Sequence, residues 1–507
     1  MSFYNHKKSP TKHLRGFAIY IAAGSMLMSG CSKSFTNSND TLLGQPSATQ
    51  FWNTASDAAS AVNSIYGNLR TYNNTAFPAI AVESMGSDDV IKGSVASDAT
   101  FMNEYNTFTI DPSESQLQGF WQGQYQNILF ANQVLDHVDT MAAVPSNLKT
   151  RYAGEAKFLR ALSYFRLERA WGNIPLLLSV PLTAAQQNIA QSTPAQVWAA
   201  IEQDLTDAAA ALPATYDAAD VGRATQGAAL ALHAKVSLYL KNWSDAVNYS
   251  GQVMALGVYS LYPDYYQMFR YAGENCSESI FEIQCDYVPN NDDINSSQYS
   301  QVQGDRDVSP SVGWGFNVPT QNLVNEFETG DYRLTSTVMV QGTTTPSGDA
   351  VPVASAGAPT MYDMKSYVPF ATAALSPNQG CGQNVRVIRY ADVLLINAEA
   401  NNEMGNSADA LTSLEMVRAR ARAQSTDPTT DIPPVTTTDQ GQLRTAIYHE
   451  RRVELAMEFD RYFDVIRQGR GAAVFGPRGW TSKNTWWPIP QSEIDLSGNK
   501  LVQNPGY

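Results

Sequence analysis

The strongest constraint on the fold is a series of alanine-rich segments in which apolar residues recur every three or four positions. This spacing places the apolar side chains on one face of an α-helix. The segment that ends at Trp171 is followed by Gly172 and Pro175, which is a normal helix stop. The pattern therefore predicts a mostly α-helical protein. The expected helices cover roughly residues 51–70, 120–138, 154–172, 194–212, 226–240, 244–255, 387–404, 408–423 and 443–467.

Two segments have the shape of a helix pair. Residues 235–257 turn at Asn242–Trp243, and residues 393–421 turn at Gly405–Asn406. Both resemble tetratricopeptide helix pairs, in which small residues such as Ala246 let the two helices approach closely. The two pairs are not contiguous and lack the full repeat signature, so they predict a tetratricopeptide-like scaffold rather than a regular array.

The stretch of residues 259–384 differs from the helical segments. It is rich in Gly, Pro, Ser, Asn, Thr and Tyr and contains short alternating runs such as SIFEIQCDY. Such a composition predicts loops and short strands. Because a long irregular insertion in a helical scaffold is usually functional, we expect the binding determinants there and in the loop of residues 83–109.

The N-terminus has the pattern of a bacterial lipoprotein signal. Four basic residues precede an apolar run over residues 17–28, and Ser29 and Gly30 lead into Cys31. The run is too short for a membrane-spanning helix, which needs roughly 20 residues. We therefore expect residues 1–30 to be removed and Cys31 to carry lipid. Residues 31–45 are polar and are predicted to form a flexible tether.

Charge and cysteine content limit the partners and cofactors. The chain carries 48 acidic and 34 basic residues, so its formal net charge is −14, which argues against nucleic acid as a partner. Besides Cys31 there are Cys276, Cys285 and Cys381. The spacing is equally compatible with a disulfide between Cys276 and Cys285 and with free thiols at these positions. Neither a CxxC motif nor a Cys/His cluster indicates zinc.

The chain shows no catalytic motif. It lacks the common protease, hydrolase, phosphate-binding and dinucleotide-binding signatures. His137, His233 and His449 are widely separated on predicted helices, where structural roles are more common. The acidic pairs Asp88–Asp89 and Asp292–Asp293 could serve a glycosidase or bind calcium loosely, but adjacent carboxylates in loops are more often solvated. We predict no catalytic residue, no metal site and no cofactor.

A charged block near the C-terminus, ERRVELAMEFDRYFDVIRQGR, allows two interpretations. Arg451, Arg452, Arg461 and Arg467 could form an anion site. Alternatively, they could form a structural ion-pair network, because acidic residues lie three or four positions away on the same helix face. The interleaved acidic residues favour the network.

This block also resembles the C-terminal signature of SusD/RagB lipoproteins, the nutrient-binding partners of outer-membrane transporters in Bacteroidetes. Four further segments resemble the same family in the same order. They are FWNTASDAASAVNSIYGNLR, GEAKFLRALSYFRLERAWGNIPLLL, VIRYADVLLINAEANNEMGN and WWPIPQSEIDLSGNKLVQNPGY. Together the five segments span nearly the whole chain after Cys31.

The resemblance implies one SusD-like domain over residues 46–507, with a helical scaffold at about 46–258 and 385–507 and the insertion at about 259–384. It also implies a non-enzymatic protein at the outer membrane that faces the cell surface and passes oligosaccharides to a SusC-like TonB-dependent barrel. Capture of peptides or glycoproteins, as in the RagB branch, and a pure envelope scaffold remain open. Many surface-exposed lipoproteins of this group have acidic residues just after the lipidated cysteine, whereas this chain has Lys33, which leaves the membrane leaflet open.

The expected ligand site is aromatic, because flat rings pack against the apolar faces of sugars while amides and carboxylates bind the hydroxyls. Trp314 is the leading candidate, because it lies in the glycine-flanked loop GWGFNVP. In contrast, Trp121, Trp171, Trp198 and Trp243 lie in helical patterns, and Trp486 and Trp487 lie in the family-like tail, so packing roles are expected. The full set of predicted ligand-binding residues is Trp314, Tyr287, Tyr299, Phe316, Tyr105, Phe101, Asp88, Asp89 and Asn290.

Overall fold

A computed structural model of the chain describes residues 51–286, 295–306, 313–353, 357–371 and 382–507. The chain divides into two compact units, residues 1–53 and residues 54–507. In the first unit, the described rings of Phe51 and Trp52 meet edge to face with centroids 5.1 Å apart. Among the described helices, none is both long enough and apolar enough to span a bilayer. The fold described below is that of the second unit.

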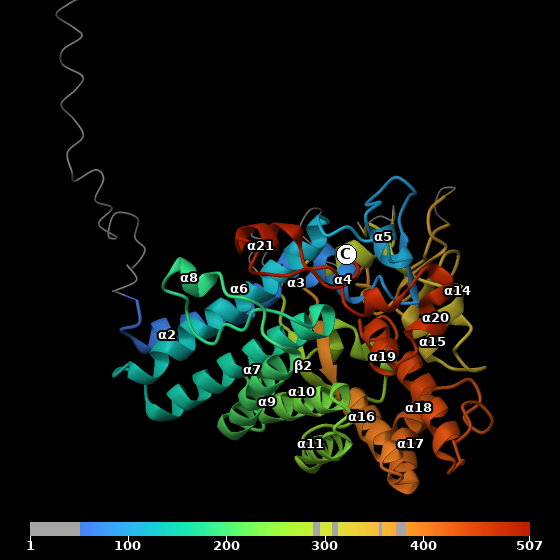
Figure 1. The fold of residues 1–507 in the computed structure, drawn as a ribbon. Coiled ribbons are helices and arrows are strands. Elements are labelled where there is room, and N and C mark those ends of the chain that lie inside the picture. Colours follow the sequence, from blue (N-terminus) through green and yellow to red (C-terminus); the bar gives the residue numbers. More distant parts are fainter. Residues whose placement is uncertain (1–50, 287–294, 307–312, 354–356, 372–381) are drawn as a thin grey trace, which may run out of the picture. The chain divides into compact units, whose positions relative to one another are not determined.

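Long helices form the scaffold (Figure 1). They are α2 (Ala55–Leu69), α6 (Ser115–His137), α7 (Ser146–Trp171), α9 (Pro194–Ala211), α10 (Gln226–Tyr239), α11 (Trp243–Ala255), α16 (Tyr390–Glu403), α17 (Ser407–Ala423) and α18 (Gln440–Glu454). The mostly α-helical prediction is confirmed. Helix α7 begins after Pro145, eight residues earlier than its periodicity indicated.

Short helices and strands make up most of the remaining regular structure. The short helices are α3 (Tyr72–Thr75), α4 (Phe77–Glu83), α5 (Met102–Thr107), α8 (Ala184–Gln187), α12 (Tyr265–Met268), α13 (Tyr299–Gln303), α14 (Gln321–Val324), α15 (Arg333–Thr337), α19 (Arg461–Arg467), α20 (Gly471–Phe475) and α21 (Gln491–Leu496). The strands are β1 (Val90–Gly93), β2 (Ser279–Ile283), β3 (Phe316–Pro319), β4 (Val338–Val340), β5 (Met361–Asp363) and β6 (Val385–Arg389).

Local sequence sets where several helices begin. At α2, the Thr54 hydroxyl accepts from the Asp57 N–H at 3.1 Å, and the Asp57 carboxylate accepts from the Thr54 N–H at 2.8 Å. Thr193 and Gln196 form the same reciprocal cap at α9, which also has Pro194 at its first position. These capping boxes satisfy backbone donors that have no partner within the helix.

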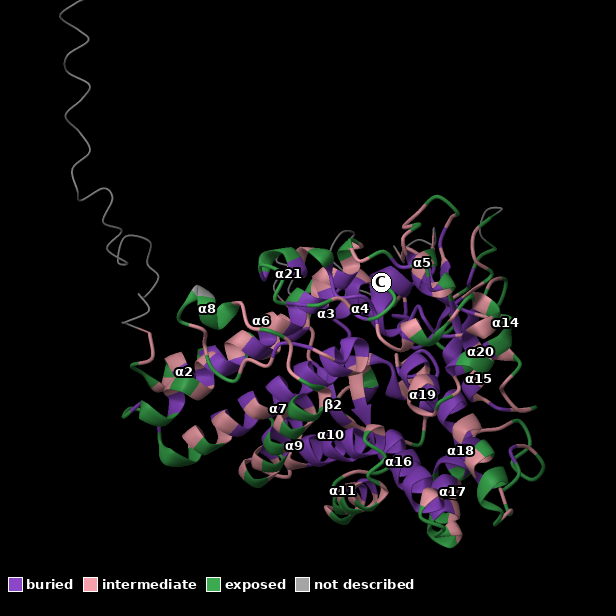
Figure 2. Cartoon of the chain, viewed as in Figure 1, coloured by how far each residue is buried: buried purple, intermediate pink, exposed green. Residues whose placement is uncertain are grey.

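The scaffold helices pack in sequence. Helix α7 lies between α6 and α9, α10 lies between α9 and α11, and α16 contacts α11, α17 and α18. The two predicted helix pairs, α10–α11 and α16–α17, meet through the buried residues Ala234, Leu238, Ala246, Ile396 and Ala400. Three of these five are alanines, so the helices can approach closely, as expected of a tetratricopeptide-like scaffold. Figure 2 shows the resulting buried core along α7, α10 and α16.

Three two-stranded antiparallel ladders connect distant parts of the chain. Strand β2, the predicted SIFEI strand, pairs with β6, and the Glu282–Arg386 pair is in register. Strand β1 pairs with β3 from Val90–Pro319 to Gly93–Phe316, and β4 pairs with β5. The first two ladders tie residues of the insertion to segments outside it. Cys276, just before β2, carries a free thiol, so it forms no bridge to Cys285, whereas Cys31 and Cys381 lie outside the described residues.

The predicted continuous helix over residues 443–467 is wrong. Helix α18 ends at Glu454, and α19 begins at Arg461. Between them Met457 and Phe459 have φ values of 66° and 69°, in the left-handed region that L-residues rarely occupy. The surrounding packing must hold them there, and the break directs Glu454 and Glu458 toward different neighbours than one straight helix would.

A buried ion-pair network surrounds the end of α18. Glu454 pairs with Arg333 of α15 at 3.0 Å, with Arg389 of β6 at 3.0 Å and with Arg420 of α17 at 2.6 Å. Glu278, beside β2, pairs with the same Arg389 and Arg420. Burial favours the neutral acid, yet Arg420, Arg389 and Arg333 together lower the pKa of Glu454. One carboxylate therefore joins three separate elements to α18.

The second half of the charged block extends this network. Arg451 pairs with Asp392 at 3.0 Å and with Asp464 at 3.1 Å, and Arg467 pairs with Glu399 and Asp464. Arg451 and Arg467 are almost completely buried in these pairs. For these two arginines, the prediction of a structural network is confirmed.

We expect Glu454→Gln to lower the free energy of unfolding by about 3–5 kcal/mol, because it leaves three buried guanidinium groups short of a negative charge. Urea denaturation measures the change. Glu415→Gln is the matched control, since Glu415 is a more exposed partner of Arg422 at 2.7 Å and its loss should cost less than about 1 kcal/mol. Equal losses in the two variants would contradict a structural role for the network.

Candidate functional site

Four aromatic rings gather where β1 and β3 meet. Phe77 begins α4, Phe101 precedes α5, Trp314 precedes β3 and Phe316 begins β3. The Phe77 ring stacks on Trp314 at 5.7 Å and meets Phe101 and Phe316 edge to face at 5.9 and 4.9 Å. Phe77, Phe101 and Trp314 are half-buried, whereas Phe316 is only 4% exposed. We call these four rings the aromatic platform.

Two glycines allow the loops that carry the platform to approach. Gly93 has φ +73°, and a Cβ there would overlap the carbonyl oxygen of Gly315. Gly315 also has a positive φ, +71°. The Ser94 N–H donates to the same Gly315 oxygen at 2.6 Å. Only glycine fits such a close backbone approach at Gly93 without strain.

Charged side chains fix the loop that leads to Phe101. The Lys92 ammonium donates to the carbonyl oxygens of Val95 and Asp98, each at 2.8 Å. Arg306 pairs with the Asp98 carboxylate at 2.6 Å, and the Ser94 hydroxyl donates to it at 3.0 Å. The hydrogen bond from Ser94, followed by those from Arg306, lowers the pKa of Asp98. The loop is therefore ordered before any ligand binds, which reduces the entropy cost of binding.

The structure brings three of the predicted residues together in the platform, Trp314, Phe101 and Phe316, and adds Phe77. No sequence signal singled out Phe77, because FPAIAVE has the composition of a core helix. Its partial exposure depends on the tertiary position of the α4 N-terminus. Tyr287 and Asn290 lie outside the described residues.

Tyr105 and Tyr299 lie in the core and not on the aromatic platform, contrary to the prediction that they form one ligand surface with Trp314. Tyr105 is fully buried, its hydroxyl donates to Glu114 and its ring lies 5.8 Å from that of Trp487. Tyr299 is 9% exposed and lies 5.8 Å from the ring of Phe459, and burial raises its pKa.

Asp88 and Asp89 also differ from their predicted role. Arg461 binds Asp88 at 2.8 Å, and Arg452 binds Asp89 at 2.7 Å. Burial favours the neutral acid at Asp88, but the hydrogen bonds from Arg461 lower its pKa. Asp89 is only 1% exposed and so has no free surface for a ligand, and the guanidinium groups compensate the charge that calcium would need at either carboxylate. The pair Asp292–Asp293 lies outside the described residues.

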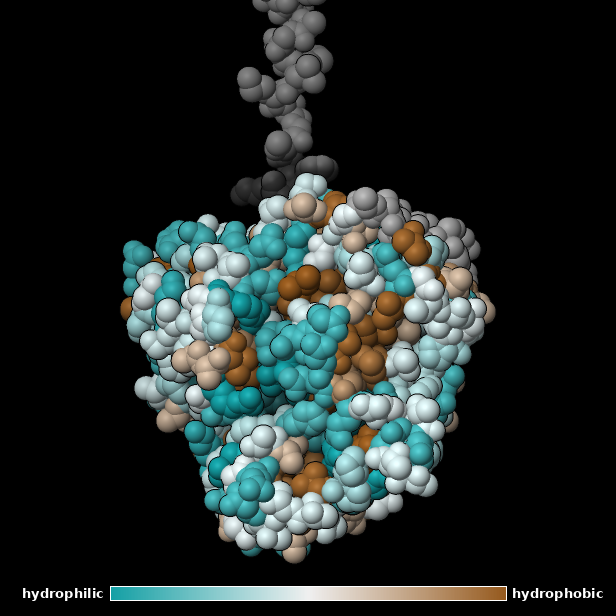
Figure 3. Space-filling view, turned by 90° about the vertical axis from the view of Figure 1, so that its right-hand side faces the viewer, coloured by the Kyte–Doolittle hydropathy of each residue, from teal (hydrophilic) through white to brown (hydrophobic). Residues whose placement is uncertain are grey.

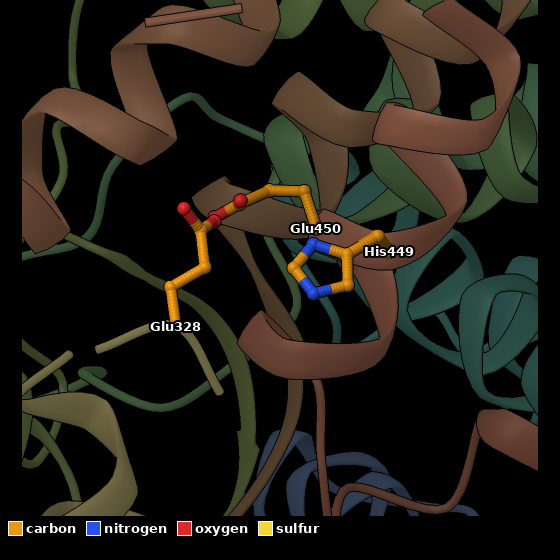
Figure 4. Close-up of side chains that lie close together, drawn as sticks. All are labelled: Glu328, His449 and Glu450. Atoms are coloured by element: carbon orange, nitrogen blue, oxygen red, sulfur yellow. The ribbon is translucent and has the colours of Figure 1, made fainter. Parts of the chain in front are cut away.

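One group of potential metal ligands is present in the described part of the chain. Atoms of Glu328, His449 and Glu450 lie within 4.8 Å of one another (Figure 4). However, Arg418 binds both Glu328 and Glu450 at 2.8 Å, and Arg333 also binds Glu450. These arginines compensate the carboxylates that a cation would need, so the cluster is an extension of the ion-pair network.

The histidines and tryptophans outside the platform have structural contacts. His449 and His137 bond to the carbonyl oxygens of Glu326 and Gln133 at 2.8 Å, and His233 stacks on Tyr249 at 3.7 Å. The buried indoles of Trp171 and Trp487 donate to Pro488 and Val82, each at 2.9 Å. Trp121 is buried, whereas Trp198, Trp243 and Trp486 are half-buried. The packing role predicted for Trp171 and Trp487 is confirmed.

The architecture defines a class of protein: a tetratricopeptide-like helical scaffold that presents a preformed aromatic surface on inserted loops. Comparison with known proteins gives the same class. The SusD family model matches residues 336–479, and a second model, described as starch-binding associating with outer membrane, matches residues 44–238. SusD-like protein P2 of Formosa agariphila is 28% identical, over 90% of this chain and 94% of its own length.

Solved structures have the same fold. A laminarin-binding SusD-like protein superimposes with a TM-score of 0.78 and 29% identity, covering 90% of this chain and all of its own. Surface glycan-binding protein A from Bacteroides thetaiotaomicron, solved with laminarihexaose, has a TM-score of 0.76 and 23% identity, covering 89% of this chain and all of its own. The chain belongs to the SusD-like family.

We expect Gly93→Ala to destabilise the protein by more than about 1 kcal/mol, because a Cβ at this positive φ would overlap Gly315 and separate β1 from β3. Urea denaturation measures the loss. Gly251→Ala on α11 is the control, since its Cβ would meet no atom within 4 Å and alanine favours the helix. If both substitutions had the same effect, the close approach at Gly93 would not be required.

Proposed function

We propose that this protein is a lipid-anchored outer-membrane protein that captures oligosaccharides at the aromatic platform and delivers them to a SusC-like TonB-dependent transporter. The observation that supports capture is the platform itself, in which Trp314 and Phe101 are half-buried around Phe77. A partly exposed ring held by its neighbours is suited to pack against the apolar face of a sugar ring.

The platform is suited to binding rather than to chemistry. Its rings are held by the Gly93–Gly315 approach and by the Lys92 and Asp98 contacts, so little side-chain entropy would be lost when a sugar binds. The Asp98 carboxylate and the Arg306 guanidinium lie on the same loop system and could bind sugar hydroxyls at the edge. We therefore assign capture without bond cleavage.

The N-terminal sequence and the family support the proposed position in the envelope. Cys31 would carry the lipid after removal of residues 1–30, and residues 31–45 would tether the domain at the outer face of the outer membrane. The name of the family model that matches residues 44–238 associates the family with the outer membrane. A SusC-like barrel is the expected partner, and nucleic acid is not expected because the chain is acidic.

The first ligand to test is a laminarin oligosaccharide, because the SusD-like protein that is 29% identical is a laminarin-binding one. We expect Trp314→Ala to weaken binding of laminarihexaose about 30-fold, equivalent to about 2 kcal/mol, as measured by isothermal titration calorimetry. Trp198→Ala is the matched control, because Trp198 is also half-buried but lies on α9, among Phe165 and Tyr239.

Three other outcomes would contradict the proposal. Binding of protein digests without binding of any glycan would favour a RagB-like role in peptide capture. A stable complex with another envelope protein in place of a transporter would favour a pure scaffold. Release of shorter oligosaccharides by the purified protein, detected by chromatography, would indicate an enzyme.

A further inference from the structure

A pocket of about 390 Å³ lies between α18, α19 and α20, and none of the platform rings lines it. Four guanidinium groups line it, together with the ring of Tyr448 and the carboxylate of Glu326. We call it the cationic pocket. Figure 3 shows the side of the domain that carries α14, α18 and α20 in Figure 1, where hydrophilic and hydrophobic side chains adjoin. The four arginines are Arg444, Arg452, Arg461 and Arg470.

The helix geometry explains why these groups converge. Arg444, Tyr448 and Arg452 are four residues apart on α18, so they share one helix face. The break after Glu454 then brings Arg461, the first residue of α19, and Arg470, just before α20, to the same pocket. A continuous helix through this segment would not place Arg461 and Arg470 beside the three residues of α18.

Three of the four arginines have carboxylate partners. Arg444 binds Glu403, Arg461 binds Asp88 and Arg452 binds Glu326 as well as the Asp88–Asp89 pair. These pairs hold the guanidinium planes in place. Within the described part of the chain, no bond is made by the Nη1 atoms of Arg444 and Arg461, which leaves them able to donate to a ligand.

Arg470 is the exception, because it forms no ion pair with any described residue. Its Nη1 donates to the side chain of Gln468 at 3.1 Å, and its guanidinium lies 5.5 Å from the centre of the Tyr448 ring. Burial, followed by the nearby charge of Arg461, lowers the pKa of Arg470. An uncompensated guanidinium beside two others is stabilised by a bound anion, and its planar fork matches carboxylate and other oxyanions.

We propose that the cationic pocket binds the carboxylate or sulfate group of an acidic sugar. The assignment of the ligand to the sugars rests on the proposed function, whereas the argument that the pocket binds an anion does not. Its volume lies within the range of small-ligand sites, and Tyr448 adds a ring beside the charges. Strand β3 and the start of α14 connect the two sites: Phe316 of β3 lies in the platform, and Asn322 of α14, six residues later, accepts from Arg452. That path is at most roughly 20 Å at about 3.3 Å per residue.

The test uses glucuronate and glucose 6-sulfate as probes, with glucose as the neutral control, in a ligand-observed NMR titration at low ionic strength. We expect at least one acidic sugar to bind saturably, glucose not to bind, and added NaCl to weaken the interaction. Binding of only one acidic sugar would identify whether the carboxylate or the sulfate is recognised.

Variants localise the binding. Arg470→Gln should weaken it about tenfold or more without exposing an unpaired carboxylate, and Arg444→Gln, on α18, provides a second test. Lys241→Gln removes one positive charge from an exposed position and should change nothing. Trp314→Ala should not change the binding of these small acidic sugars, and Arg470→Gln should not change the binding of laminarihexaose. The failure of one proposal can therefore be distinguished from the failure of the other.

Failure of both acidic sugars to bind, or equal binding by Arg470→Gln and the unmodified protein, would overturn the proposal. Inorganic sulfate that binds as tightly as glucose 6-sulfate would also overturn the assignment to a sugar, because the pocket would then recognise charge alone.

Discussion

Buried charge at the end of α18 joins the inserted segments to the helical scaffold. Glu454 is shared by Arg333, Arg389 and Arg420, which come from an inserted helix, a strand and a scaffold helix. Burying so many charges costs desolvation energy, so such networks contribute little net stability compared with apolar packing. Their effect is on geometry, since each guanidinium is satisfied in only one arrangement of its neighbours. The network thereby fixes the insertion against the helical scaffold.

The same principle extends to both candidate sites. At the platform, Lys92 and Arg306 anchor the loop that bears Phe101, while Gly93 and Gly315 let it approach the loop that bears Trp314. At the cationic pocket, carboxylates orient three arginines, while Arg470 has no carboxylate partner among the described residues. In both proposed sites the side chains are therefore held in position by the protein itself, which is the general route to affinity on a rigid scaffold.

The scaffold could be predicted from sequence because helix periodicity and capping are local properties. The break between α18 and α19 could not, since the left-handed Met457 and Phe459 are imposed by tertiary packing. Burial is also a tertiary property, which is why Tyr105 and Asp89 looked like ligand contacts although each is at most 1% exposed. The loop position and partial exposure of Trp314 could be predicted because glycines flank it, whereas no local sequence feature indicates that Phe77 is partly exposed.

We propose that glycan capture occurs on the aromatic platform. A crystal structure of the protein with laminarihexaose would locate the bound sugar. We expect a sugar ring within roughly 4.5 Å of Trp314, with Phe101 or Phe77 also in contact. A bound oligosaccharide on another face of the domain, with the platform rings left exposed to solvent, would contradict it.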